Sequence, residues 1–370
     1  MSPQAEADRA HMRHALALGA RGLGQTWPNP AVGCVIVKDN RIVGRGWTQP
    51  GGRPHAEVRA LAQAGAAARG ATAYVTLEPC AHHGKTPPCA EALIAAGVAR
   101  VVTALQDPDP RVAGRGHDIL RAAGIHVTEH VEARAATEAH AGFLLRVSQG
   151  RPLLTLKLAS SFDGRIATAT GESRWITGPA ARHHVHALRH SHDAVLVGAG
   201  TARADDPMLT VRGFGPVRQP VRVVAARRLD LASDGQLARS AREVPLWLLH
   251  DPAQSSAATQ ARWQDLGATL LSVPTLIGRH LDPAAMLAAL GAAGLTRVFC
   301  EGGGSLAASL LSAGLVDELI GFTAGVALGA EGQPALGALG LDTLASAPRF
   351  QLVEARAIGG DILHHWRRAT

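Results

Sequence analysis

Three residues that can bind a metal, His55, Cys80 and Cys89, each stand at the end of an expected helix or strand. His55 opens an amphipathic helix, Pro79-Cys80 ends a strand, and Cys89 starts the next helix. One histidine and two thiolates fill three positions of a tetrahedral zinc ion and leave the fourth for water, as in catalytic rather than structural sites. The positive ends of the two helix dipoles also favour thiolate ligands. The chain must therefore fold so that two helix starts and one strand end meet.

Glu57 follows His55 by two residues, and the order His-x-Glu, then Pro-Cys and a further Cys, is typical of zinc deaminases of nucleobases. In such a site zinc lowers the pKa of its water to about 7. Glu57 would take a proton from that water and deliver it to the ring nitrogen and the departing ammonia. The alternative is a closed zinc site, or two buried thiols beside a surface histidine. The ordered combination of residue types favours the catalytic interpretation.

The other cysteines and a histidine-rich segment invite different interpretations. Cys34 lies in an apolar strand and Cys300 in the string RVFC, so we expect both to pack as small hydrophobic side chains. In the expected helix 179–190, His186 and His190 are four residues apart and could share a face. No carboxylate or thiol accompanies them, so we interpret these histidines as solvated or satisfied in the core rather than as metal ligands.

Length and composition indicate a two-domain globular protein with an anionic partner. The chain has 370 residues, which is long for one core, and 46% of them are hydrophobic. Its net charge of +7 favours anionic ligands. Aromatic residues make up only 4% of the chain, so the stacking platforms of a nucleic-acid binder are hard to find, and we expect a phosphorylated small molecule instead.

Nothing in the sequence indicates export or a membrane. The first residues contain no apolar stretch that could act as a signal peptide, and no run of about 18 apolar residues could span a bilayer. Four cysteines in a chain of this size do not make a disulfide framework. We therefore expect a cytoplasmic protein.

Alternating helix and strand patterns predict an α/β fold in both halves. In the first half we expect helices at 5–24, 55–70, 89–98, 114–124 and 132–145, and strands at 31–37, 41–47, 71–79, 100–108 and 125–130. In the second half we expect a largely parallel sheet with strands at 152–159, 192–200, 220–226, 243–250 and 296–304. Gly150 and Pro152 are the strongest boundary signal, so we expect domains at 1–146 and 152–370 joined by a linker at 147–151.

The loop between the two cysteines carries a more specific resemblance. Eight residues separate Cys80 from Cys89, and the string Cys-x-His-x-Gly-Lys-Thr-Pro-Pro-Cys resembles the riboflavin-biosynthesis deaminases. The stretches 28–33, Pro-Asn-Pro-x-Val-Gly, and 107–116 match the same family. The resemblance implies a cytidine-deaminase-like α/β/α domain. It also implies substrate contacts at Asn29, His82, Lys85 and Asp107, with Lys85 suited to a phosphate. Asp109 departs from the asparagine that the family usually has.

The second half resembles the reductase part of the bifunctional riboflavin deaminase/reductases, a domain similar to dihydrofolate reductase that uses NADPH. The resemblance is carried by the strings 157–167, 171–177, 198–212 and 300–306. The substrate positions it implies are Lys157, Ser173, Arg189, Leu209, Arg212 and Glu301. The cofactor positions it implies are Ala159, Trp175, Thr201, Asp205, Gly303, Gly304, Ser305 and Leu306. After Arg-Val-Val-x the family often has Asp-Ser, where this chain has Ala226-Arg227, so Arg227 could replace a hydroxyl contact to the cofactor.

The leading hypothesis is a bifunctional enzyme of riboflavin biosynthesis with one zinc ion per chain and NADPH. It would deaminate a diaminopyrimidinone ribosylamine phosphate and then reduce the ribosyl group to ribityl. We expect a phosphorylated pyrimidine substrate, no nucleic-acid or membrane partner, and a homo-oligomer. The alternative is an editing deaminase of tRNA or single-stranded DNA with an accessory domain. A zinc-stabilised protein that senses a nucleotide is a third possibility, but it leaves Glu57 without a purpose.

Overall fold

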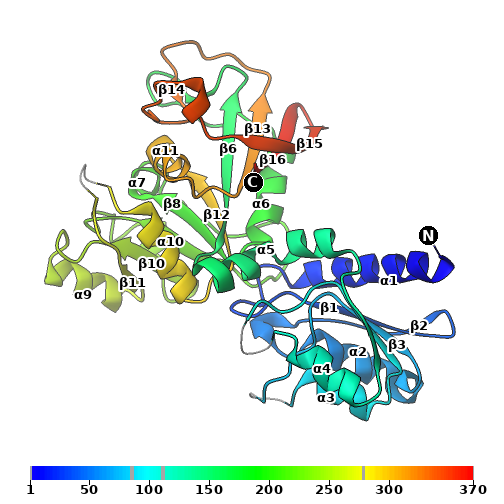
Figure 1. The fold of residues 1–370 in the computed structure, drawn as a ribbon. Helices are drawn as coiled ribbons and strands as arrows, with labels where there is room; N and C mark the ends of the chain where they lie inside the picture. Colours follow the sequence, from blue (N-terminus) through cyan, green and yellow to red (C-terminus); the bar gives the residue numbers. More distant parts are fainter. Residues whose placement is uncertain (1, 84–86, 110–112, 277–279, 370) are drawn as a thin grey trace. The chain divides into compact units, whose positions relative to one another are not determined.

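The computed structural model describes residues 2–83, 87–109, 113–276 and 280–369 (Figure 1). The expected phosphate contact Lys85 lies outside these residues. The chain divides into two compact units, Met1–Gly150 and Arg151–Thr370. The helix expected at 132–145 extends further, because α5 (Ala133–Gln149) continues to Gln149 before Gly150 ends it with a positive φ of 70°. The first residues of the expected linker are therefore helical.

The sheet of the first unit has the strand order β2-β1-β3-β4-β5. Strand β1 pairs antiparallel with β2 and β3, whereas β3, β4 and β5 run parallel. The strands are β1 (Gly33–Lys38), β2 (Arg41–Trp47), β3 (Thr72–Val75), β4 (Arg100–Thr103) and β5 (His126–Thr128). The other helices of this unit are α1 (Pro3–Gly19), α2 (Ala56–Ala64), α3 (Cys89–Ala95) and α4 (Arg115–Ala122).

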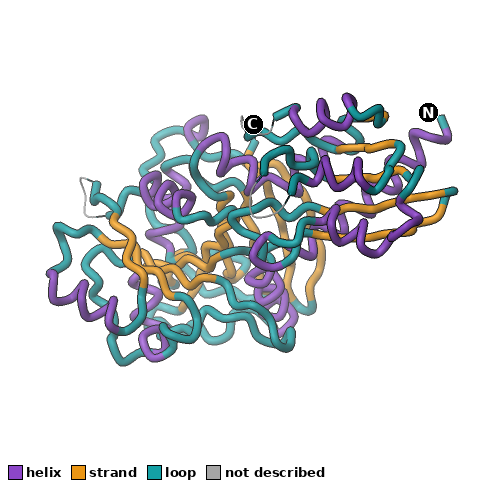
Figure 2. The backbone as a smooth tube through the Cα atoms, turned by 90° about the horizontal axis from the view of Figure 1, so that it is seen from below, coloured by secondary structure: helices purple, strands orange, loops and turns teal. Residues whose placement is uncertain are grey.

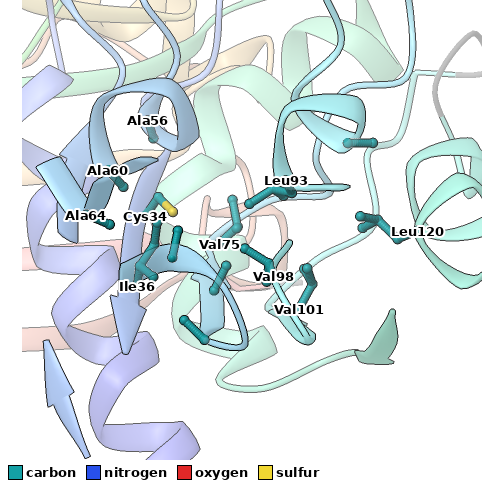
Figure 3. Close-up of a cluster of buried hydrophobic side chains, with 14 of the residues drawn as sticks. Cys34, Ile36, Ala56, Ala60, Ala64, Val75, Leu93, Val98, Val101 and Leu120 are labelled. Atoms are coloured by element: carbon teal, nitrogen blue, oxygen red, sulfur yellow. The ribbon is translucent and has the colours of Figure 1, made fainter. Parts of the chain in front are cut away.

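Side chains of β1 alternate between two cores, one on each face of this sheet. Cys34 and Ile36 join a cluster with α2, α3 and α4, to which Leu93 and Leu120 contribute (Figure 3). Val35 and Val37 face the other way and pack against α1 and α5. Because strand side chains alternate with a period of two, an unbroken apolar strand is buried on both faces. The expected three-layer α/β/α domain is confirmed, and Cys34 is fully buried in it.

Two glycines of β2 allow α2 to lie directly on the sheet. A Cβ atom at Gly46 would lie 2.1 Å from the carbonyl oxygen of Ala56, and one at Gly44 would lie 2.2 Å from that of Ala60. Real Cβ atoms do not approach so closely, so any side chain here would push the helix away. The first turn of α2 follows His55, and these glycines therefore help to set the position of that residue.

The second unit contains a sheet in the order β11-β10-β9-β8-β12-β6-β13-β16-β15. Every neighbouring pair from β11 to β13 is parallel, as expected, and only the last two pairs are antiparallel. The strands are β6 (Leu153–Ser161), β8 (Ala194–Gly198), β9 (Val221–Ala225), β10 (Leu246–His250), β11 (Thr269–Ser272), β12 (Arg297–Gly302), β13 (Glu318–Ala324), β15 (Phe350–Ile358) and β16 (Asp361–Arg368). A small second sheet pairs β7 (Arg165–Ala167) with β14 (Gln333–Pro334).

Helices pack along the strands of the large sheet (Figure 2). Trp263 of α9 and Leu237 of α8 pack with Val224 and Leu248 of the sheet, whereas α6 packs on β13 and β16 through Ala181 and Phe322. The helices are α6 (Pro179–His190), α7 (Ala199–Asp205), α8 (Gln236–Arg239), α9 (Ala257–Asp265), α10 (Pro283–Ala292) and α11 (Gly304–Ser312). None of the helices in the described part of the chain is both long enough and apolar enough for a membrane span.

Candidate functional site

The three expected metal ligands meet at one point in the first unit. His55 is the N-cap residue of α2, Cys89 is the first residue of α3, and Cys80 lies in the loop after β3. The Nδ1 atom of His55 lies 3.3 Å from the Sγ of Cys89 and 3.6 Å from the Sγ of Cys80. All three candidate ligand atoms are within 4.8 Å of one another, and no other such metal-binding group occurs among the described residues. This nitrogen and sulfur donor set fits a tetrahedral zinc ion with one open position.

The surroundings of the two thiols favour a thiolate in this cluster. Hydrogen bonding from the Cys89 thiol is the largest effect on Cys80 and, with His55 and the Cys89 backbone N–H, lowers the pKa of Cys80 to about 4 against the effect of burial. The backbone N–H of Cys89 donates to the Sγ of Cys80 over 3.3 Å. The thiolate of Cys80, together with burial, raises the pKa of Cys89. A divalent cation would favour ionisation of both thiols, since metal binding requires deprotonated ligands.

Glu57 lies in the first turn of α2 beside this cluster and is only 4% exposed. Burial is the main cause that raises its pKa to about 7, and the negative charge of Cys80 adds to the effect. A carboxyl group with a pKa near the operating pH can both accept and return a proton, which is what general acid-base catalysis needs.

The expected substrate contacts of the first unit lie on loops at different degrees of exposure. Asn29 packs against η2 (Pro50–Gly52) so closely that a Cβ atom at Gly52 would lie 1.8 Å from its Nδ2. His82 is exposed. Asp107 is buried, and its burial, with the neighbouring charges of Asp109 and Glu78, raises its pKa to about 6. Asn29 and Asp107 are thus fixed by packing, whereas His82 is not.

Glu78 is a residue of this region that the sequence analysis missed. Its side chain is 4% exposed and accepts three backbone hydrogen bonds, from Asp107 (3.1 Å), Gly114 (3.0 Å) and Gly116 (2.8 Å). The only sequence signal is a charged residue at the end of a buried apolar strand, two positions before Cys80. Its partners are main-chain groups, which no residue pattern reveals.

In the second unit, Lys157, Arg189 and Glu301 form a partly buried charged group. Leu156 of β6 pairs with Cys300 of β12, so the next residue of each strand, Lys157 and Glu301, lies at the same level of the sheet. The ladder between β12 and β8 is interrupted at Glu301, and such bulges redirect side chains. Arg189 of α6 binds both carboxylate oxygens of Glu301, and its Nη1 donates to the carbonyl oxygen of Thr210 over 2.8 Å.

The charges of this group are shifted by burial and by each other. Burial alone would raise the pKa of Glu301, but Arg189 and Lys157 outweigh it and lower that pKa. Burial lowers the pKa of Lys157, although Glu301 partly offsets the effect. A partly buried cluster of two cations and one anion keeps a positive balance that suits an anionic or electron-rich ligand.

Other expected reductase residues lie near this group or near the glycine turn after β12. Leu209 is buried next to Thr210, and the backbone N–H of Arg212 donates to Nδ1 of His186 over 3.2 Å. Ala159 follows Lys157 by two residues on β6, and Asp205 ends α7. Thr201 donates to the carbonyl oxygen of Gly302 over 3.3 Å. The backbone of Gly303 has a φ of 102°, and Gly304, Ser305 and Leu306 begin α11.

Ser173 and Trp175 are not brought to this group by any described contact. Both are exposed in the segment between β7 and α6, and the ring of Trp175 lies 4.7 Å from the guanidinium of Arg182. The histidines of α6 have contacts within the unit. His183 stacks on Phe214 at 5.0 Å between ring centroids, and His190 also lies against that ring.

A cavity of about 350 Å³ lies at the carboxyl ends of β8 and β9, between α7 and the start of α11. Its basic lining residues are Arg203, Arg227, Arg228 and His280, and Ser305 also lines it. Arg203 pairs with Asp230 over 2.9 Å, whereas the guanidinium of Arg227 makes no hydrogen bond with a described residue. Crevices at the carboxyl ends of parallel strands are the usual place for nucleotides in α/β folds. Arg227, which the sequence analysis singled out, therefore lies where an anionic cofactor group can reach it.

Comparison with family models assigns both units. Residues 5–105 match the cytidine and deoxycytidylate deaminase zinc-binding region, and residues 152–364 match the RibD C-terminal domain.

Relatives match almost the whole chain. The riboflavin biosynthesis protein RibD of Escherichia coli (strain K12) is 45% identical over 97% of this chain and 98% of its own. RibD of Bacillus amyloliquefaciens is 41% identical over 95% and 94%. Among solved structures, Acinetobacter baumannii RibD has a TM-score of 0.88 at 40% identity, covering 99% of this chain and 100% of its own. A Thermotoga maritima diaminohydroxyphosphoribosylaminopyrimidine deaminase/5-amino-6-(5-phosphoribosylamino)uracil reductase has a TM-score of 0.86 at 32% identity, with the same coverage.

Proposed function

The chain belongs to the RibD family of riboflavin-biosynthesis enzymes, and we propose that its two units carry the two reactions of that family at the sites described above. It is a bifunctional enzyme, a zinc-dependent deaminase and an NADPH-dependent reductase. The deaminase domain would end near Gly150 and the reductase domain would begin near Arg151, close to the expected linker. The substrate would be the phosphorylated ribosylaminopyrimidine that the name of the Thermotoga maritima relative describes.

In the deaminase, His55, Cys80 and Cys89 would hold the zinc ion, because their ligand atoms lie within reach of one ion. Zinc, when bound, lowers the pKa of a coordinated water to about 7 and so supplies a nucleophile near neutral pH. Glu57 would accept a proton as water attacks the amino-bearing ring carbon. It would pass this proton to the ring nitrogen, then take the second proton from the hydroxyl group that the attack has formed and pass it to the leaving amino group, so that ammonia departs and a carbonyl remains.

Substrate contacts in the deaminase would come from Asn29, His82, Lys85 and Asp107. Support comes from the fixed side chains of Asn29 and Asp107 and from the short chain distance between His82 and the ligand Cys80. A rigid contact beside the metal can hold the reacting carbon in one position, which contributes much of an enzyme's rate.

In the reductase, the substrate would lie over Lys157, Arg189 and Glu301, with Ser173, Leu209 and Arg212 as further contacts. NADPH, when bound, supplies the hydride that converts the ring-opened ribosyl carbon to the ribityl chain. Glu301 and Thr210 fix Arg189 but do not use all of its N–H donors, so the remaining donors can bind a substrate oxygen. Lys157 would donate a hydrogen bond to the former ring oxygen, which becomes a hydroxyl group as the sugar ring opens.

The cofactor would lie along the glycine turn and the basic cavity. Ala159, Trp175, Thr201, Asp205 and residues 303–306 are the positions proposed for it. The cavity lined by Arg227 and Ser305 is large enough for part of a nucleotide and has an excess of positive charge. The alternative function, an editing deaminase with a nucleic-acid-binding module, is disfavoured because the second unit matches a reductase domain.

The observation that carries this proposal is the convergence of His55, Cys80 and Cys89 beside the buried Glu57. The test is to supply the phosphorylated diaminopyrimidine and to follow ammonia release and NADPH oxidation together. We expect one ammonia for each NADPH oxidised, with ammonia release continuing when NADPH is omitted. Ammonia release without any NADPH oxidation would contradict the two-step assignment.

We also propose a homo-oligomer and a cytoplasmic location. Strand β15 is an edge strand with Leu352 and Val353 about half exposed, and Ile362 of β16 is 53% exposed. An exposed apolar edge of this kind is normally covered, and a second copy of the chain is the proposed occupant. All four cysteines are free thiols, which suits a reducing compartment. Sedimentation analysis of the parent and of V353K would test the oligomer, since the added charge should favour the monomer.

A further inference from the structure

The carboxylate of Glu78 joins two segments of the deaminase unit that are far apart in the sequence. One oxygen accepts the backbone N–H groups of Asp107 and Gly114, and the other accepts that of Gly116. Asp107 lies after β4, whereas Gly114 is the N-cap residue of α4 and Gly116 lies in its first turn; residues 107–109 are called the Asp107 loop here. Glu78 itself lies two residues before Cys80, in the loop that leads to the metal ligands. A single side chain thus connects the Asp107 loop and the start of α4 to the ligand loop.

The fit between these segments is tight. A Cβ atom at Gly116 would lie 2.0 Å from the carbonyl oxygen of Pro79 and 3.1 Å from an oxygen of Glu78, so only glycine allows this approach. Hydrogen bonds from N–H groups to a carboxylate are stronger than those to a neutral acceptor. The side chain of Glu78 is 4% exposed, so little water competes for these bonds.

We propose that Glu78 is a positioning residue of the deaminase, which fixes the Asp107 carboxylate at a set distance from the metal ligands. The inference rests on the proposed role of Asp107 as a substrate contact. Asp107 is 9% exposed, and its Oδ1 accepts the backbone N–H of Asp109 over 2.9 Å, so its carboxylate is held within the loop. Glu78 holds the backbone of that same residue. Substrate bound to Asp107 is therefore placed relative to Cys80 through one rigid chain of contacts.

The chemistry of Glu78 explains why a carboxylate is needed. Its two oxygens accept three N–H groups, whereas a glutamine side chain has only one oxygen and a donor NH₂ group in place of the other. Glu78→Gln would set that NH₂ group against the N–H of Gly116, or against those of Asp107 and Gly114. The Asp107 loop and the start of α4 must then shift relative to each other, because buried unpaired donors are costly. Asp107 moves with its loop.

The test is the E78Q variant of the full-length zinc-loaded protein. We expect zinc content to stay near that of the parent, because none of the ligands is changed. The KM for the pyrimidine substrate should rise by about tenfold or more, since small misplacements of a contact are costly, while kcat falls less than about threefold. The reductase rate on supplied deaminated intermediate should match the parent and so reports on folding of the rest of the chain. An unchanged KM, or loss of zinc from E78Q, would overturn the proposal.

Two further variants separate this proposal from the role of Asp107. If Glu78 acts through Asp107, then E78Q/D107N should have a KM no higher than about twice that of D107N, because the two changes break one chain of contacts. If the KM increases of E78Q and D107N instead multiplied in the double variant, the inference would be overturned and the role of Asp107 would remain. If D107N alone left KM unchanged, the proposed substrate contact would itself be wrong.

The E78D variant covers the case in which E78Q does not fold. Aspartate keeps both carboxylate oxygens on a shorter side chain, so KM should lie between those of the parent and D107N, with zinc retained. An E78D protein that folds, holds zinc and has the KM of D107N or higher would contradict the proposal, because a retained carboxylate would then give no rescue.

Discussion

The environment of the buried Glu57 carboxyl group brings its pKa close to neutral pH. Burial raises its pKa to about 7, and the adjacent thiolate of Cys80 acts in the same direction. An exposed glutamate would be ionised throughout the physiological range and would return a proton poorly. The position of Glu57 in the first turn of α2, two residues after the ligand His55, therefore supplies both its location and its acidity.

The Glu57→Gln variant should lose deamination and keep zinc. Glutamine preserves the size of the side chain but cannot accept and return a proton, so ammonia release should fall by about 10²- to 10⁴-fold. Metal content should stay near one zinc per chain, whereas Cys80→Ser and Cys89→Ser should lose the metal. NADPH oxidation on supplied deaminated intermediate should change by less than about twofold. A zinc-loaded E57Q protein that released ammonia at the parental rate would contradict the role given to Glu57.

Arg227 should discriminate between NADPH and NADH. Its guanidinium lines the basic cavity without a described hydrogen-bond partner, and NADPH differs from NADH by one phosphate on the adenosine ribose. Arg227→Ser should raise the KM for NADPH by about tenfold, as expected for a lost charged hydrogen bond, and change that for NADH by less than about twofold. The matched control is Arg262→Ser on α9, an exposed arginine outside the cavity. Equal effects of R227S on both cofactors would exclude the phosphate contact.

At the residue scale, the sequence could identify groups whose chemistry is unusual but not those that act through the main chain. The convergence of His55, Cys80 and Cys89 was predictable because few functions need that order of side chains at helix and strand ends. Glu78 was not, because its partners are three backbone N–H groups that become neighbours only in the fold. The contact between His186 and the backbone of Arg212 also depends on folding, since it joins residues of two separate segments.

Among the elements, α1 is joined to the sheet of the deaminase unit by one buried carboxylate. Asp8 is 4% exposed and binds the guanidinium of Arg100 through two hydrogen bonds of 2.8 and 2.7 Å. The hydroxyl of Tyr74 donates to it over 2.8 Å. Burial opposes the charge of Asp8, but the hydrogen bonds from Arg100, Gln4 and Tyr74 outweigh it and lower its pKa. One residue of α1 therefore links the helix to both β3 and β4.

Asp8→Asn should destabilise the deaminase unit by about 1.5–3 kcal/mol, the usual range for charged hydrogen bonds. The folded pKa of Asp8 lies below its unfolded value of about 3.9, so its stabilisation is fully present above that value and is lost as the pH falls through the folded pKa. The difference in free energy of unfolding between parent and D8N should therefore be constant from about pH 5 to 7 and shrink below about pH 4. This difference can be measured by urea unfolding, with hydrogen exchange in peptides of residues 2–150 as the readout.

The control for D8N is Asp118→Asn on α4. Asp118 is 79% exposed at its side chain and lies 3.6 Å from Arg121, so its loss should change the free energy of unfolding by less than about 0.5 kcal/mol. A D8N protein as stable as D118N at pH 7 would show that α1 is held by its apolar face alone, through residues such as Met12 and Ala15.

Element prediction succeeded where burial imposes a clear pattern. The parallel strands β8, β9 and β10 are apolar runs between turn residues, because both of their faces are covered. The edge strand β15 and its neighbour β16 were not expected. Most of β15 is exposed, so its sequence lacks the apolar run that marks the inner strands. Pairing with β16 forms this strand, and pairing is not visible in a local pattern.

At the scale of the whole molecule, each proposed reaction centre lies within one unit. The zinc ligands and Glu57 belong to the unit Met1–Gly150, and the group of Lys157, Arg189 and Glu301 belongs to the unit Arg151–Thr370. The expected linker at 147–151 rests on Gly150 and Pro152, which interrupt any regular element. The end of α5 was harder to place, since residues 146–149 are compatible with either a helix or a linker.

The two units should function as separate fragments cut between Gly150 and Arg151. Fragment 1–150 should bind zinc and release ammonia, and fragment 151–370 should oxidise NADPH on the deaminated intermediate, each at a rate within about threefold of the full chain. The cut position matters because Arg151 pairs with Asp317 over 2.7 and 2.8 Å, and Asp317 also accepts the N–H of Leu154 at the start of β6. Fragment 152–370 lacks this arginine and leaves a half-buried carboxylate without its cation, so it should be less stable than 151–370 by about 1–3 kcal/mol. If both fragments fold and neither reacts until they are mixed, each centre must borrow residues from the other unit, and the assignment of one reaction to each unit would be wrong.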